Sequence, residues 1–131
     1  MILVDASVLI AHLDEDDAQH ERAVECLLEW AEQPLACSPI TLAEVLVGPA
    51  RQGRLDRARD ALARLGIDEV PLPVDAPARL ASLRAETQLK LPDCCVLLAA
   101  QHGTARAVLT FDERLARSAE RLGFGPGSGS G

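Results

Sequence analysis

Aromatic residues are scarce in this chain of 131 residues, which contains one Trp, two Phe and no Tyr. Extensive binding of single-stranded nucleic acid by stacking of bases on exposed rings is therefore not expected. Hydrophobic residues still make up 48% of the sequence, so the interior must be built from Leu, Val, Ile and Ala. A chain of this length forms one domain that can bury a core without disulfides or metal ions.

Long apolar runs are also missing, and no stretch approaches the roughly 20 residues that a helix needs to cross a bilayer. The N-terminal segment carries no positive charge before its apolar stretch, so it does not resemble a secretory signal. The four cysteines lack CxxC spacing and have apolar neighbours, which favours a structural role: Cys26, Cys37, Cys94 and Cys95. These features predict a cytoplasmic protein in a reducing compartment, with no membrane segment.

Positive charge is in deficit, since the net charge is −7 and the pI is near 4.9. Considered alone, this argues against a nucleic-acid partner, because phosphate binding depends on Lys and Arg. Bound cations would offset acids gathered into a metal site, so the local distribution matters more than the total. One dense basic stretch contains Arg51, Arg54, Arg57, Arg59 and Arg64. Two interpretations stay open for it: pairing with Asp56 and Asp60 on one solvated helix, or contact with phosphate or a protein partner.

Short apolar runs alternate with helical patterns along the chain. Strands are predicted at residues 2–4, at 35–37, around Val70 and at 107–110. Helices are predicted to begin at Ser7, to span residues 39–47 up to Gly48-Pro49, and to cover 51–65. Further helices are expected over about 23–31, from about 80 to Leu89, from Pro92-Asp93 to 100, and over 113–122. The alternation predicts an α/β fold of three layers, with a short parallel sheet flanked by helices on both faces.

The domain is expected to span residues 1–123. The Gly- and Ser-rich residues 124–131 are interpreted as a flexible tail or an added linker.

Four carboxylates stand where a parallel sheet brings ligands together, outside the carboxyl ends of its strands. Asp5 directly follows the first predicted strand and Asp112 comes shortly after the last. Asp93 starts a predicted helix and Glu44 lies within one. Converging carboxylates repel one another by about 4 kcal/mol per close pair at an effective dielectric near 20. An all-oxygen set therefore suits Mg²⁺ or Mn²⁺, which can activate water for phosphodiester hydrolysis.

Each acid also has a simpler interpretation. Asp93 and Asp112 are possible helix N-caps, and Glu44 alone fits a solvated helix surface. Asp5 is the most informative, because a charge straight after Ile-Leu-Val is unfavourable unless it is paired or ligating. The histidines are interpreted as structural or surface residues, since no nucleophile accompanies them: His12, His20 and His102.

Four segments resemble, in order and spacing, the acid-bearing segments of PIN-domain proteins, and most closely those of VapC-type toxins: MILVDASVLIAHL, SPITLAEVLVG, LPDCCVLLAA and VLTFDERLA. The resemblance covers residues 1–123. It implies that Asp5, Glu44, Asp93 and Asp112 bind the metal and act in catalysis, supported by the polar Ser7 and Thr110. It also implies a Mg²⁺- or Mn²⁺-dependent endoribonuclease that forms a homodimer and is inhibited by a cognate antitoxin.

Other functions were weighed against this one. A haloacid-dehalogenase-like phosphatase would need a second acid in Asp5-Ala6-Ser7, and a receiver domain would need a lysine after Lys90. The remaining alternative is a PIN-like module that sequesters RNA or a protein partner without cutting. An association surface is expected where apolar residues flank Gly48-Pro49: Leu42, Val45, Leu46 and Leu55.

Overall fold

A single parallel sheet forms the centre of the protein, whose computed structural model describes residues 1–125. Residues 126–131, most of the expected tail, lie outside the described residues. The strands are β1 (Ile2–Val4), β2 (Leu35–Cys37), β3 (Ile67–Glu69) and β4 (Ala107–Leu109). They are all parallel, in the order β3-β2-β1-β4. The expected parallel sheet is confirmed. β1 is a central strand, so its carboxyl end lies between the carboxyl ends of β2 and β4.

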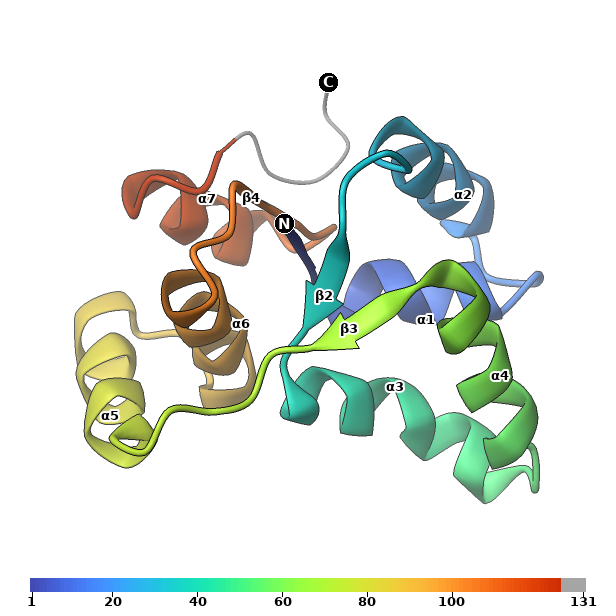
Figure 1. The fold of residues 1–131 in the computed structure, drawn as a ribbon, viewed down its shortest axis with the longest axis horizontal. Coiled ribbons are helices and arrows are strands. Elements are labelled where there is room, and N and C mark those ends of the chain that lie inside the picture. The colour runs from blue at the N-terminus through green and yellow to red at the C-terminus, as the bar shows by residue number, and fades with distance from the viewer. Residues whose placement is uncertain (126–131) are drawn as a thin grey trace.

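Helices cover both faces of this sheet (Figure 1). One layer contains α1 (Ala6–Leu13), α2 (His20–Glu29), α3 (Pro39–Arg51) and α4 (Leu55–Leu65). The other contains α5 (Ala76–Thr87), α6 (Leu91–His102) and α7 (Glu113–Arg121). This is the three-layer α/β architecture that the sequence pattern predicts.

Alternation along the strands divides the core into two apolar layers. Ile2 and Val4 pack towards α1 and α2, whereas Leu3 packs towards α6. Because α6 is buried at every position from Cys94 to Ala100, it has no polar face in its centre. Only its first turn, which carries Asp93, reaches the surface at the carboxyl edge of the sheet. The acid is thus presented by a rigid, fully packed helix.

The helix boundaries predicted around Gly48-Pro49 were wrong. α3 does not end at Gly48-Pro49 but runs through Pro49 to Arg51. Pro49 removes one helical amide, yet its own carbonyl accepts from the amides of Gln52 and Arg54, which closes the last turn. The next helix begins at Leu55 rather than near Arg51, because Gly53 adopts a positive φ of 69° and breaks the helical path.

The third strand was predicted around Val70 and lies just before it. Val70 is buried, and its amide donates to the carbonyl of Cys37, so it extends the contact of β3 with β2. β3 lies at one edge of the sheet, since it ends the strand order. The following segment contains Pro71 and Pro73, which lack the amide that a further ladder needs.

The expected apolar surface beside Gly48-Pro49 is only partly exposed. Val45 is buried, and Leu42 and Leu46 pack against the core. Leu55 is exposed as expected, and the neighbouring exposed residues on α3 are Ile40 and Val47. Among the described residues, no helix is both long enough and apolar enough to cross a membrane.

Candidate active site

Asp5 is a buried carboxylate at the carboxyl end of β1. Its side chain and backbone together are only 7% exposed. Ser7 Oγ donates to Asp5 Oδ2 at 2.8 Å, and Thr110 Oγ1 donates to the same oxygen at 2.7 Å. Two hydroxyls, one from α1 and one beyond β4, therefore fix the orientation of this carboxylate. Both use Oδ2, so neither hydroxyl competes for Oδ1.

Ser7 and Thr110 also fasten the loop that follows β4. The amide of Phe111 donates to Ser7 Oγ at 3.0 Å, and the amide of Asp112 donates to Thr110 Oγ1 at 3.0 Å. The expected helix start at Ser7 was wrong, because Asp5 occupies the N-cap position of α1, without a side-chain capping bond. Ser7 lies inside the first turn, where its hydroxyl reaches the acid and the loop instead.

Glu44 and Asp93 lie in the same electrostatic neighbourhood as Asp5. The pKa of Glu44 is raised first by desolvation and then by the charges of Asp5 and Asp93. The pKa of Asp93 is raised by desolvation, Asp5 and Asp112, and is lowered to a smaller extent by Lys90 and Arg114. Carboxylates contributed by β1, α3, α6 and the start of α7 thus act on one another, which requires that they be near neighbours.

Asp112 combines its place near the acids with a capping role. Its Oδ1 accepts from the amides of Arg114 and Leu115 at 2.9 and 3.1 Å, so it is the N-cap of α7. The capping interpretation is wrong for Asp93, because α6 begins at Leu91 and Lys90 holds the N-cap position. Asp93 makes no capping bond and its carboxylate is half-buried in the first turn.

These acids do not form a ready-made cage. Within residues 1–125, no three His, Cys, Asp or Glu side chains are close enough to enclose a metal ion as they stand. Uncompensated carboxylates repel one another, and a divalent cation would relieve that repulsion. The chemistry of the donor set fits Mg²⁺ or Mn²⁺, because every candidate ligand is a carboxylate oxygen.

The histidines and cysteines contribute no hydrogen bond to the acids among the described residues, although burial and the nearby charges of Asp93 and Glu44 raise the pKa values of Cys94 and Cys95. His12 and His20 stack on each other at 6.3 Å between ring centroids, and His20 Nδ1 is 2.8 Å from the carbonyl of Ala11. Burial and the charge of His20 lower the pKa of His12. All four cysteines are buried, and burial raises the pKa of Cys37 to about 12. Burial of the cysteines fits the structural role expected for them.

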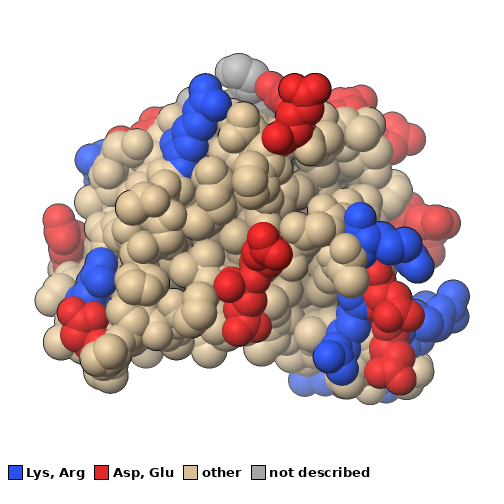
Figure 2. All heavy atoms as spheres, in the orientation of Figure 1, with Lys and Arg blue, Asp and Glu red and all other residues tan. Residues whose placement is uncertain are grey.

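The arginine-rich stretch is exposed over the end of α3 and over α4, where Figure 2 shows its basic side chains interleaved with acidic ones. Only two ion pairs occur within residues 1–125, Arg79 with Asp75 and Arg117 with Glu113, each at 3.9 Å. Pairing of this stretch with Asp56 and Asp60 is therefore absent from the described structure. Its arginines remain available to an outside partner.

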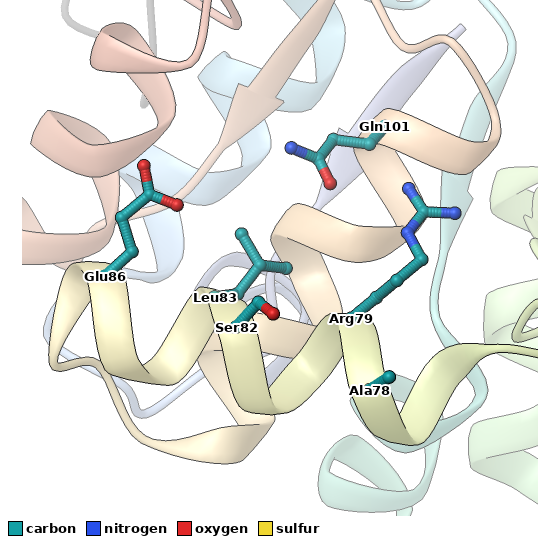
Figure 3. A pocket seen from close by; sticks show the side chains of 6 residues that line it. All are labelled: Ala78, Arg79, Ser82, Leu83, Glu86 and Gln101. Atoms are coloured by element: carbon teal, nitrogen blue, oxygen red, sulfur yellow. The ribbon is translucent and has the colours of Figure 1, made fainter.

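A separate hollow lies between α5 and α6 (Figure 3), with a volume of about 280 Å³. It is lined by Ala78, Arg79, Ser82, Leu83, Glu86 and Gln101. Gln101 lies about two helical turns beyond Asp93 on α6, and no candidate acid reaches this hollow. It does not contribute to the acid site.

Sequence reasoning did not connect two of the cations near the acids to the site. Arg114 was not singled out, although its amide binds Asp112 and its charge acts on Asp93. Arg22 was also not singled out, and its guanidinium carbon lies 4.4 Å from the centroid of the Phe111 ring. Phe111 is the only aromatic residue in the four acid-bearing segments, and that was the available signal.

Comparison with known proteins identifies the fold family. The family model of the PIN domain matches residues 2–121. The chain belongs to the PIN-domain family. Comparison with curated proteins gives no match.

Solved structures of toxin–antitoxin proteins resemble this PIN domain. A toxin–antitoxin complex from Klebsiella pneumoniae is 29% identical, with a TM-score of 0.74 over 88% of this chain and 90% of that one. VapC20 from Mycobacterium tuberculosis, a toxin that cleaves the sarcin–ricin loop, is 20% identical, with a TM-score of 0.71 over 90% and 95%. FitAcB from Neisseria gonorrhoeae is 22% identical, with a TM-score of 0.69 over 92% and 94%. The recognition of a VapC-like PIN fold is thereby confirmed.

Proposed function

We propose that this PIN-domain protein is a metal-dependent endoribonuclease and the toxin of a toxin–antitoxin pair. The observation that carries the proposal is the acid cluster around Asp5, in which one carboxylate is fixed by two hydroxyls and its neighbours have raised pKa values. Such a cluster is short of positive charge, and perturbed carboxylates gathered at a sheet edge are typical of functional sites.

The residues that would hold Mg²⁺ or Mn²⁺ are Asp5, Glu44, Asp93 and Asp112. When bound, the ion would supply an activated water and neutralise charge on the phosphate. Ser7 and Thr110 position Asp5 by donating to Oδ2. The raised pKa of Glu44 in the metal-free protein comes from desolvation and from the charges of Asp5 and Asp93, and a bound ion would offset those charges.

The proposed partners follow from the relatives. The similar structure from Klebsiella pneumoniae is a toxin–antitoxin complex, so we propose a cognate antitoxin and, with it, a homodimer of this chain. An inhibitor could place an arginine at the acids, since a guanidinium binds carboxylates bidentately. Four buried cysteine thiols fit action in the reducing cytoplasm. We assign the nuclease domain to residues 1–123.

The direct test is cleavage of structured RNAs by the purified protein with Mg²⁺ or Mn²⁺, compared with the same reaction in EDTA. We expect metal-dependent cleavage that chelation abolishes. RNA that is bound but never cut, at any metal concentration, would instead favour the module that sequesters a partner. Cleavage that persists unchanged in EDTA would contradict the metal-dependent mechanism.

A further inference from the structure

Arg22 lies over an aromatic ring beside the acid site. Its guanidinium carbon is 4.4 Å from the centroid of Phe111, the geometry of a cation–π contact. Arg22 comes from the first turn of α2, whereas Phe111 follows β4. The contact therefore joins two segments far apart in the sequence and gives an exposed side chain a defined position.

The backbone of Phe111 is linked to Asp5 through Ser7. The Phe111 amide donates to Ser7 Oγ at 3.0 Å, and that hydroxyl donates to Asp5 Oδ2 at 2.8 Å. Phe111 also lies between Thr110, which binds Asp5, and Asp112, which caps α7. The position of Arg22 is thus set relative to the acids by a short chain of contacts.

The charge of Arg22 is not used within the described protein. No carboxylate lies within ion-pair distance of it in residues 1–125. The guanidinium has five N–H donors, and the ring uses none of them as a hydrogen-bond partner in the described residues, so they can bind the oxygens of a phosphate. Arg22 covers one face of the Phe111 ring, which leaves that face closed to a stacking base.

We propose that Arg22, held over Phe111, binds an RNA backbone phosphate next to the one that is cut. The inference rests on the proposed nuclease function and names a substrate contact for it. A fixed cation at the edge of an acidic site attracts the polyanion without neutralising the carboxylates that hold the metal. This places one end of the RNA path over α2 and the loop after β4.

The test measures RNA binding separately from cleavage. A pool of short fluorescein-labelled single-stranded RNAs is titrated with protein in Mg²⁺, followed by fluorescence anisotropy at several salt concentrations. All proteins carry Asp93→Asn to prevent cutting. We expect Arg22→Gln to weaken binding about tenfold at low salt, as for loss of one charged hydrogen-bonding group. The slope of log Kd against log salt should fall by about 0.7, the value for one phosphate contact on a single strand.

Two variants separate this role from a structural one. Arg22→Lys keeps the charge and should retain the salt slope while losing part of the affinity. Arg121→Gln removes an exposed arginine at the far end of α7, about 13 Å along the helix from Asp112, and should change neither value. If Arg22 only stabilises the packing of α2 against the loop after β4, Arg22→Gln should lower the melting temperature and leave the salt slope of RNA binding unchanged.

The outcomes also distinguish this inference from the proposed function. If Arg22→Gln and Arg121→Gln bind RNA alike, the assignment of Arg22 is wrong even when the wild-type protein cleaves RNA. If the wild-type protein binds RNA without cutting it, the nuclease proposal fails, and a reduced salt slope in Arg22→Gln still supports the contact. If the protein binds no RNA, both are contradicted.

Discussion

Asp5 and Glu44 lie near each other at one edge of the sheet, but their surroundings are opposite. Asp5 is buried and its Oδ2 accepts two hydroxyl hydrogen bonds. Glu44 is exposed on α3, and within residues 1–125 its carboxylate has no hydrogen-bond or ion-pair partner. Asp93 resembles Glu44, since it also lacks a bonded partner and its pKa is raised. One side of the site is therefore organised by hydrogen bonds, and on the other side the carboxylates have no hydrogen-bond partner within residues 1–125.

This difference explains how the fold tolerates so many acids. Two hydroxyl donors satisfy Oδ2 of the buried Asp5. Glu44 and Asp93 receive no such compensation, so their mutual repulsion is retained in the folded protein. Under the proposed function, a bound cation would offset this repulsion, and the metal-free protein would be less stable because of it.

The largest effect is expected from Asp5→Asn. The amide keeps an oxygen that can accept from Ser7 and Thr110, but it removes the charge at the organised side of the site. Cleavage should fall by at least about 100-fold, the scale for loss of a group that stabilises charge in the transition state. RNA cleavage rates with Mn²⁺ measure this, with Asp68→Asn on the exposed strand β3 as the control. Equal rates in wild type and Asp5→Asn would remove Asp5 from the mechanism.

An intermediate effect is expected from Thr110→Val, which preserves shape and removes the hydroxyl. Asp5 loses one donor and the Asp112 amide loses its acceptor. Activity should fall about 10- to 100-fold, as for loss of a group that orients a metal ligand. Unfolding free energy should fall by about 1–3 kcal/mol, because Thr110 is fully buried. Urea denaturation and cleavage kinetics measure both, with the exposed Ser82→Ala as the control. Unchanged activity would show that the hydroxyl does not orient Asp5.

The smallest effect is expected from Asp93→Asn in metal-free protein. The folded protein raises the pKa of Asp93, so ionisation of this carboxyl opposes folding as the pH rises above the unfolded value of about 4. The helix dipole of α6 favours the charge, but desolvation and the neighbouring acids outweigh it. The variant should gain a few tenths of a kcal/mol, up to about 1, at pH 7.5, because the half-buried group is partly screened. The gain should vanish near pH 3.5.

Urea denaturation in EDTA at the two pH values measures this difference, with Asp68→Asn as the matched charge-removing control. A variant less stable than wild type at pH 7.5 would show that Asp93 supports the start of α6 rather than a cation.

The sequence was sufficient for the architecture and for the organised acid. Apolar triplets such as Ile2–Val4 predict buried parallel strands, and a charge directly after one of them predicts a special environment for Asp5. The helix boundaries at Pro49 and Gly53 were not predictable, because tertiary packing decides whether a proline ends a helix near its last turn. The individual side-chain roles could not be predicted either, because they depend on contacts between segments far apart in the sequence.

The contacts of Ser7 and Arg22 are examples of this. Local pattern suggested that the Ser7 hydroxyl caps a helix, whereas it binds Asp5 and the Phe111 amide from across the sheet edge. The stack of Arg22 on Phe111 joins α2 to the loop after β4, and no spacing rule connects those residues. The capping role of Asp112, by contrast, was local and was foreseen.

Cation binding itself tests the contrast between the two sides of the site most directly. Isothermal titration of Mn²⁺ into wild type, Asp93→Asn and Asp68→Asn at pH 7.5 needs no RNA and no turnover. The account predicts saturable binding to wild type and Asp68→Asn, and binding to Asp93→Asn that is weakened at least about tenfold, since one unit of ligand charge is lost. Wild-type binding should also weaken as the pH falls through the raised pKa values of Glu44 and Asp93. Identical titrations for all three proteins, or none that saturates, would contradict a cation site built from these acids.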